Sequence, residues 1–249
     1  MTTDVFFGDA TGDWRAVMSQ RMGMVFRGLW IVSGVSLCAA VAMMVWYAPA
    51  DPEQGLIQKI FYLHLGAAIG MLVAAGGVLV GSAGYLWQRD LRWDLLADAS
   101  ARAAVVLLFT VLMTGMFWAR QAWGRWWEWS PPLTFSLILW ILYVAYMVIR
   151  RLRLPRPRLA TTSAVFGLLA SLDLPLVYLS LQFLPSSHLS AGERAPEMAY
   201  TLLAWVVAVG LLAVCMIWTR YLISRAANFE ANPAEKPAAV SVQPAGGRA

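Results

Sequence analysis

Six apolar segments dominate this sequence of 249 residues, and each is long enough to cross a bilayer as a helix. A helix rises about 1.5 Å per residue, so about 20 apolar residues span a hydrocarbon core about 30 Å thick. Backbone polar groups in lipid must be satisfied within each segment, which favours helices. The sequence predicts an all-α integral membrane protein with one six-span domain, residues 1–224. The expected spans are approximately 25–48, 57–87, 103–119, 133–149, 160–184 and 199–223.

Composition supports the same class. Hydrophobic residues make up 60% of the chain and charged residues 13%, with a mean hydropathy of +0.62. A soluble domain has about a quarter charged residues. The first span follows a polar stretch without a cleavage motif, which indicates a retained span and no signal peptide. Residues 225–249 are rich in Ala and Pro and are expected to form a disordered cytoplasmic tail.

The basic residues predict the orientation. With six spans both termini lie on one side, and that side carries fifteen of the nineteen Lys and Arg residues. Because Lys and Arg mark the cytoplasmic side, both termini are predicted to be cytoplasmic, and the net charge of +5 is not read as a sign of nucleic-acid binding. The other, outer side keeps four cations: Lys59, Arg120, Arg125 and Arg194.

Both histidines of the chain are predicted to lie on the outer side. His64 is near the outer end of the second span, and His188 is in the loop between the fifth and sixth spans. The outer loop between the third and fourth spans is unusually rich in tryptophan. Together with the end of the third span, it holds Trp118, Trp123, Trp126, Trp127 and Trp129. Three separate pieces of sequence therefore meet on one surface, and we interpret that meeting as a binding site.

Tryptophan also gathers at membrane interfaces without any ligand, and that explanation suffices for the other tryptophans. Five in one short loop exceed what anchoring requires. If the loop is helical up to the prolines, Trp123, Trp126 and Trp127 lie at i, i+3 and i+4 on one face with Arg120. That face would be a flat aromatic platform with a cation at its edge.

The histidine pair favours heme over a simple metal ion. A structural zinc site needs four ligands, and the outer loops have no Cys and few carboxylates to supply them. Two imidazoles complete a six-coordinate heme iron, because the porphyrin supplies the other four nitrogens. Cys38 and Cys215 are isolated in apolar runs, so covalent CxxCH attachment is excluded. The sequence predicts non-covalent heme b with His64 and His188 as axial ligands, indoles against its face and the outer cations near its propionates.

Three segments resemble the CcmC family of heme-handling membrane proteins, within the wider family named for its tryptophan-rich WWD domain. They are KIFYLHLGAAIGM at 59–71, WGRWWEWSPPLTFSLILWILYV at 123–144 and LDLPLVYLSLQFLPSSH at 172–188. The resemblance covers nearly all of residues 20–223. It implies that His64 and His188 match the family's axial ligands and that Trp123, Trp126, Trp127 and Trp129 match its aromatic platform.

The same resemblance implies a function in the type I system of cytochrome c maturation. The protein would hold heme at the outer face of the bacterial inner membrane and pass it to a periplasmic heme chaperone of the CcmE type. Its expected neighbours are an ABC-type ATPase with a membrane subunit and a small single-span protein. This is a relay and not an enzymatic reaction, and the sequence has no Walker P-loop of its own.

The sequence departs from the family pattern at the predicted site. Ser130 and Pro132 stand where the family carries an acidic residue and an arginine, so the usual propionate partner is absent there. Lys59 stands where the family tends to carry arginine, which keeps the charge and loses the planar guanidinium. Phe183 and Leu184 replace tryptophans before His188. Arg125 is a candidate replacement cation.

Two other classes remain open at this stage. A bis-histidine b-type electron-transfer protein, such as a quinone oxidoreductase, would also use two imidazoles, although its ligands usually lie within the spans. A scaffold or permease subunit with an aromatic belt would bind no heme.

Two features inside the spans have structural explanations. The second span carries Gly66, Gly70, Gly77 and Gly81 in two pairs of small residues, which predict close packing against a neighbouring span. Asp173 lies in the fifth span near Pro175, which frees backbone groups that a side chain can help satisfy.

Overall fold

The computed structural model describes residues 10–52, 54–182 and 195–231. Within these ranges the chain is helical, without a β-strand, and two short segments are wound as π-helix (η1) and 3-10 helix (η2). The elements in chain order are α1 (Ala10–Ala42), η1 (Met43–Tyr47), η2 (Leu56–Gln58), α2 (Lys59–Gln88), α3 (Leu91–Trp123), α4 (Pro131–Ile149), α5 (Arg156–Ser171), α6 (Asp173–Gln182) and α7 (Pro196–Ala231).

The described residues include six helical segments long and apolar enough to cross a membrane. Four of them are Leu56–Gln88, Leu91–Trp123, Pro131–Ile149 and Pro196–Asn228, and the other two, Gly23–Tyr47 and Arg156–Ser180, each combine two consecutive elements. The predicted fold class, an all-α multi-pass membrane protein with six spans, is confirmed.

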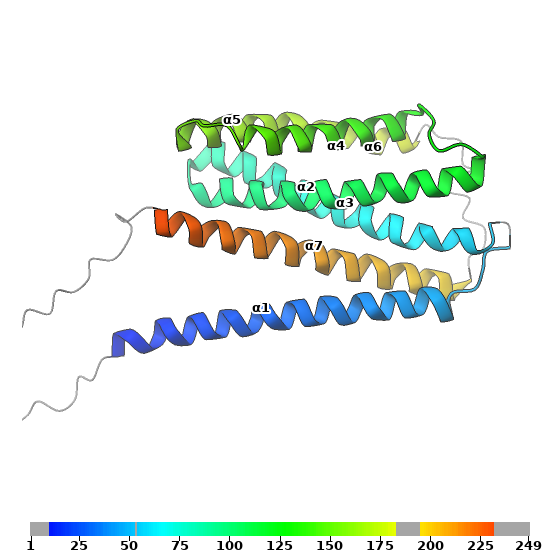
Figure 1. The fold of residues 1–249 in the computed structure, drawn as a ribbon, viewed down its shortest axis with the longest axis horizontal. Helices are drawn as coiled ribbons and strands as arrows, with labels where there is room; N and C mark the ends of the chain where they lie inside the picture. Colours follow the sequence, from blue (N-terminus) through cyan, green and yellow to red (C-terminus); the bar gives the residue numbers. More distant parts are fainter. Residues whose placement is uncertain (1–9, 53, 183–194, 232–249) are drawn as a thin grey trace, which may run out of the picture.

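The helices lie along one long axis, and successive helices run in opposite directions apart from the continuous pair α5 and α6 (Figure 1). One end of the bundle carries residues 43–52, 54–58 and 118–130, and we call it the tryptophan end. The other carries residues 150–155, and we call it the arginine end. The start of α1 and the end of α7 lie at the same end, the arginine end (Figure 1).

Helix α2 is central because it packs against α3, α5 and α7. Its glycines allow these close approaches. A Cβ on Gly66 or Gly70 would lie 3.1 Å from atoms of α7, and a Cβ on Gly81 would lie 2.7 Å from the backbone nitrogen of Ala97 in α3. A Cβ on Gly77 would overlap Ser100, also in α3. The prediction that these glycines serve helix packing is confirmed, with one pair facing each neighbour.

Helix α3 begins at Leu91, well before the first residue of the expected span, 103. Its first turns contain Asp94 and Asp98, which are 6% and 3% exposed. Arg150, at the end of α4, donates to both oxygens of Asp94. Asp98 accepts a hydrogen bond at 3.0 Å from Arg102, one turn further along α3. It also pairs with Arg220 of α7 at 3.8 Å. These ion pairs explain how a charged segment can be part of a buried helix.

The α2–α3 connection is a tight turn whose residues cap both helices. Arg89 adopts a left-handed conformation with φ 56° and ends α2. Asp90 is the N-cap of α3, and its side chain accepts from the backbone nitrogen of Arg92 at 2.9 Å. A carboxylate at this position satisfies a free N–H group at the helix start.

The fifth span is interrupted at Leu172, between α5 and α6. Pro175 explains the break, since its ring would clash with the carbonyl of Ser171 in a continuous helix and it has no N–H to donate. The Ser171 hydroxyl bonds to the Gly167 carbonyl at 2.8 Å, and Asp173 begins the next helix with 6% of its surface exposed.

The last helix is longer than expected. It ends at Ala231, so residues 225–231 are helical although they were assigned to the disordered tail. The remainder of that tail, residues 232–249, lies outside the described residues.

Helix α1 packs against α7. The indole nitrogen of Trp30 in α1 donates a hydrogen bond to the Thr219 hydroxyl of α7 at 3.1 Å.

Candidate functional site: a cavity beside His64

A cavity of about 240 Å³ lies at the tryptophan end among α2, α3, α4 and α6. His64, Trp118, Trp123 and Trp127 are part of its lining. The remaining lining is apolar except for Ser136. It consists of Ile60, Phe61, Ala68, Met71, Leu108, Val111, Leu112, Gly115, Met116, Ala119, Pro132, Leu133 and Val177.

The cavity extends below His64 toward the middle of the bundle. Met71 follows His64 by seven positions on α2, which is about 10 Å along a helix. Leu108 of α3 also lines this deeper part and is fully buried. The site therefore has an apolar inner part and an aromatic outer part, as expected of a pocket for a largely apolar ligand.

Helix α3 contacts the imidazole of His64 through Thr114 and Gly115. Its Nδ1 lies 3.0 Å from the hydroxyl oxygen of Thr114. Gly115 follows Thr114 on α3, and a Cβ there would lie 3.3 Å from Cε1 of the imidazole. The imidazole thus lies directly against α3 while it lines the cavity.

Three of the five predicted tryptophans line the cavity, and two do not. Trp118 and Trp123 pack edge to face with ring centroids 5.1 Å apart. Trp127 lies in the connection between α3 and α4, residues 124–130. Its indole nitrogen is buried without a hydrogen-bond partner within the described residues. Trp126 and Trp129 are 49% and 74% exposed and contact Phe117 and Trp127, respectively.

The predicted helical platform is wrong. Helix α3 ends at Trp123, because Gly124 adopts φ 75° and its N–H bonds to the Arg120 carbonyl at 3.1 Å. Residues 125–130 are not helical, and α4 starts at Pro131. Trp126 and Trp127 therefore do not share a helical face with Trp123 and Arg120. Trp127 instead reaches the cavity from the connection, and the glycine that ends the helix is the physical reason.

Three of the four predicted cations, Lys59, Arg120 and Arg125, lie around the tryptophan end, outside the lining of the cavity. The ammonium of Lys59 lies 3.3 Å from the Val45 carbonyl and so connects the end of η1 to the start of α2. The guanidinium of Arg120 donates to the Gly124 carbonyl. Both are cations at helix carboxyl ends, where free carbonyls attract positive charge. Arg125 is exposed in the connection.

His188 and Arg194, together with Phe183 and Leu184, lie outside the described residues. The predicted pairing of the two histidines therefore stays a prediction. Among the described residues, no three His, Cys, Asp or Glu side chains come together in a way that could hold a bare metal ion. Within that part of the chain, the cavity beside His64 offers one imidazole and several indoles, a set suited to a large ligand that brings its own metal coordination.

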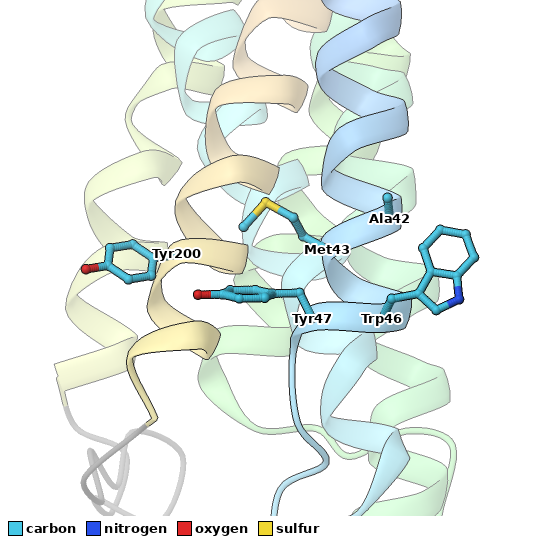
Figure 2. A pocket seen from close by; sticks show the side chains of 5 residues that line it. All are labelled: Ala42, Met43, Trp46, Tyr47 and Tyr200. Atoms are coloured by element: carbon cyan, nitrogen blue, oxygen red, sulfur yellow. The ribbon is translucent and has the colours of Figure 1, made fainter.

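A second hollow lies at the same end between α1 and α7. It measures about 450 Å³ and is lined by Ala42, Met43, Trp46, Tyr47 and Tyr200. Figure 2 shows Tyr47 and Tyr200 on one side of it and Trp46 pointing to the other. Although it is larger, it is shallow and has no histidine, cysteine or carboxylate in its lining. We therefore take the cavity beside His64 as the candidate functional site.

Sequence reasoning had not identified Thr114, Gly115 or Ser136 as parts of the site. Thr114 and Ser136 are polar residues inside apolar spans, and that is the signal that could have drawn attention to them. Gly115 gives no such signal, because its role depends on which side of α3 faces α2.

The fold and the cavity define a multi-pass helical membrane protein with a histidine and an indole-lined site near one end of its spans. Comparison with known proteins assigns the family. The family model described as heme exporter protein C, CcmC, matches residues 12–233, so the chain belongs to the CcmC family.

Individual relatives agree with this assignment. Heme exporter protein C of Paracoccus denitrificans is 38% identical over 122 residues, which are 48% of this chain and 50% of that protein. The protein of the same name from Bradyrhizobium diazoefficiens is 29% identical over 195 residues, 75% of this chain and 74% of that protein. The Escherichia coli K12 protein is 30% identical over 166 residues, 64% of this chain and 67% of that protein. The aligned region thus spans about half to three quarters of these relatives.

Proposed function

We propose that this protein binds heme at the outer face of the bacterial inner membrane and delivers it to a periplasmic heme chaperone of the CcmE type for cytochrome c maturation. The name of its relatives, heme exporter protein C, supports the coarser part of this proposal, a role in heme export. The observation that carries the finer part is the position of His64 in a cavity lined by three indoles.

Heme fits this site by its chemistry. Its apolar ring matches an apolar lining, indoles pack against aromatic faces, and a neutral imidazole is a common axial ligand of heme iron. The cavity volume of about 240 Å³ is below the range of about 300–1,000 Å³ typical of ligand pockets. A porphyrin would therefore extend out of it along Trp123 and Trp127, and such partial exposure suits a ligand that must be passed on.

The second axial ligand in this proposal is His188, which would approach from the connection between α6 and α7. The propionates would meet cations of the tryptophan end, with Arg125 as the first candidate because it is exposed beside Trp126. Arg120, Lys59 and Arg194 are the alternatives, and the first two would have to give up their backbone carbonyls.

The tryptophan end faces the periplasm in this proposal, and the arginine end faces the cytoplasm, where Lys and Arg concentrate. Both termini are then cytoplasmic. The proposed partners are the chaperone at the tryptophan end and, within the membrane, an ABC-type ATPase with its membrane subunit and a small single-span protein. The energy for transport would come from that ATPase.

The test is a titration of the detergent-purified full chain with hemin, followed by absorption spectroscopy, beside His64→Gly and His188→Gly. We expect low-spin bands of a bis-histidine heme in the native chain and their loss in each variant. Free imidazole should restore the bands in His64→Gly, because the small ligand can occupy the space that the side chain leaves.

Native-like bands in His64→Gly without added imidazole would refute the ligand assignment. A cellular assay complements this result, since both variants should also reduce the yield of mature cytochrome c. Membership in the CcmC family favours this function over an electron-transfer protein, and reversible reduction of the bound heme by quinol would support that rival.

A further inference from the structure

Two consecutive residues of α3 hold the imidazole of His64. Thr114 is 9% exposed, and its hydroxyl oxygen lies 3.0 Å from Nδ1 of His64. Gly115 lies under the ring, where a Cβ would be 3.3 Å from Cε1 and 3.7 Å from Nδ1. His64 and Thr114 are 50 positions apart, so this contact depends on the packing of α2 against α3.

The hydrogen bonds of Thr114 determine which ring nitrogen carries the proton. A hydroxyl has one hydrogen to donate. The Thr114 hydroxyl donates it to backbone carbonyls of its own helix, at 2.7 Å to Thr110 and 3.1 Å to Val111. With that hydrogen used within the helix, the Thr114 oxygen acts as an acceptor toward His64, and this arrangement assigns the proton of the neutral ring to Nδ1. In that tautomer the lone pair is left on Nε2.

Gly115 fixes the position of the ring. A Cβ 3.3 Å from Cε1 is closer than ordinary van der Waals contact, so any larger residue would push the imidazole away from α3. The absence of a side chain at Gly115 therefore allows the approach that brings Nδ1 to Thr114.

We propose that Thr114 and Gly115 are positioning residues that hold His64 in the Nδ1–H tautomer and present Nε2 to a ligand metal. This inference rests on the proposed function, because it assigns the purpose of the arrangement to heme iron. A hydrogen bond to the distal nitrogen of a metal-binding histidine orients the ring and raises its basicity, and its loss costs about 10- to 100-fold in metal affinity.

The first experiment needs no heme. The chain has two histidines, so His188→Ala leaves His64 as the single histidine signal. Nitrogen-15 NMR of the histidine-labelled apoprotein at about pH 8.5, where imidazole is neutral, distinguishes the two tautomers. We expect Nδ1 protonated and Nε2 unprotonated, with a shift toward the other tautomer in Thr114→Val. A predominant Nε2–H tautomer in the Thr114-containing chain would overturn the proposal.

The second experiment measures hemin affinity and the midpoint potential of the bound heme. Thr114→Val keeps the shape of the side chain and removes the acceptor. We expect an affinity loss of about 10- to 100-fold and a higher midpoint potential, because a less basic imidazole stabilises ferric iron less. Thr114→Ser should restore both values. Gly115→Ala should also weaken hemin binding, by displacing the ring.

Thr110→Val is the matched control. Thr110 is one turn away on α3, and its hydroxyl makes the same kind of bond, to the Val106 carbonyl at 3.0 Å. Its replacement should leave affinity and potential unchanged. If Thr114→Val behaves like Thr110→Val while His64→Gly loses heme, the positioning role is wrong and the proposed function stands. If His64→Gly keeps native heme bands, the assignment of His64 as an axial ligand fails by itself, and the NMR result still decides the tautomer.

Discussion

Among the five tryptophans at positions 118–129, burial separates two groups. Trp118, Trp123 and Trp127 line the cavity with His64, whereas Trp126 and Trp129 are 49% and 74% exposed. An indole contributes to ligand affinity where it is desolvated against the ligand, and an exposed one contributes little. The two groups should therefore differ in their effect on heme binding, although all five were predicted to bind it.

Trp127→Ala should weaken hemin binding by about tenfold, because a favourable aromatic contact is worth about 0.5–1.5 kcal/mol beyond its buried area. Trp126→Ala is the control in the same connection, and its hemin affinity should change little. Both affinities can be measured by hemin titration of the purified variants. Equal losses in the two variants would mean that the exposed surface, and not the cavity, binds the ligand.

The sequence alone could identify some residues of the site and not others. His64 and the tryptophan-rich loop were predicted to meet because the alternation of spans assigns each loop to a side of the membrane. Thr114 and Gly115 depend on the rotation of α3 about its own axis, which hydropathy does not determine. Their role becomes visible only when the 3.0 Å contact with His64 is known.

At the scale of helices, α2 uses its glycines in two separate contacts. Gly66 and Gly70 face α7, and Gly77 and Gly81 face α3. The spacing of small residues could be recognised in the sequence, but the division between two neighbours could not, since it depends on where each helix crosses α2. Close backbone approach makes these helices sensitive to the smallest added side chain.

Gly81→Ala should lower the thermal stability of the protein in detergent, at a cost of about 1–3 kcal/mol. Its new Cβ would lie 2.7 Å from the backbone nitrogen of Ala97 and 2.8 Å from the Trp93 carbonyl, so α2 and α3 would have to separate. Gly76→Ala is the control on the same helix, because nothing lies within 4 Å of its Cβ position. It should be neutral or slightly stabilising. Thermal unfolding followed by circular dichroism compares the two, and a Tm for Gly81→Ala at or above that of Gly76→Ala would contradict the packing argument.

The ends of α3 illustrate two different reasons why helix boundaries were misjudged. Asp94, Asp98 and Arg102 are charged, so the expected span began at 103. Asp94 pairs with Arg150 and Asp98 with Arg102, however, and the helix starts at Leu91. At the other end, the i, i+3, i+4 spacing of tryptophans favoured a continuing helix. Gly124 overrides that pattern with a left-handed conformation.

For the whole molecule, the ion pairs at the arginine end connect helices that are distant in the sequence. Asp94 and Asp98 of α3 pair with Arg150 at the end of α4, and Asp98 also pairs with Arg220 of α7. The Arg150 side chain is 13% exposed and the two carboxylates are 7% and 5% exposed, so these charges are poorly solvated. Removal of one partner leaves charge without compensation, which costs more than the loss of a surface pair.

Arg150→Met should destabilise the protein by about 3 kcal/mol, the lower end of the range for a broken buried pair. Arg151→Met removes a neighbouring, exposed arginine and should have little effect. Denaturant unfolding in detergent micelles measures both. Similar stability of the two variants would show that solvent or lipid headgroups compensate Asp94 and Asp98 without Arg150.

The position of the lining residues along the chain also sets the order in which the site is made. All described lining residues lie between Ile60 and Val177, and a ribosome delivers the chain from its N-terminus. A nascent polypeptide that has reached Gln182 already contains them. At that stage α7, the helix against which Gly66 and Gly70 pack, has not yet been synthesised. The packing of α7 against Gly66, two residues after His64, therefore has to follow the synthesis of every described lining residue.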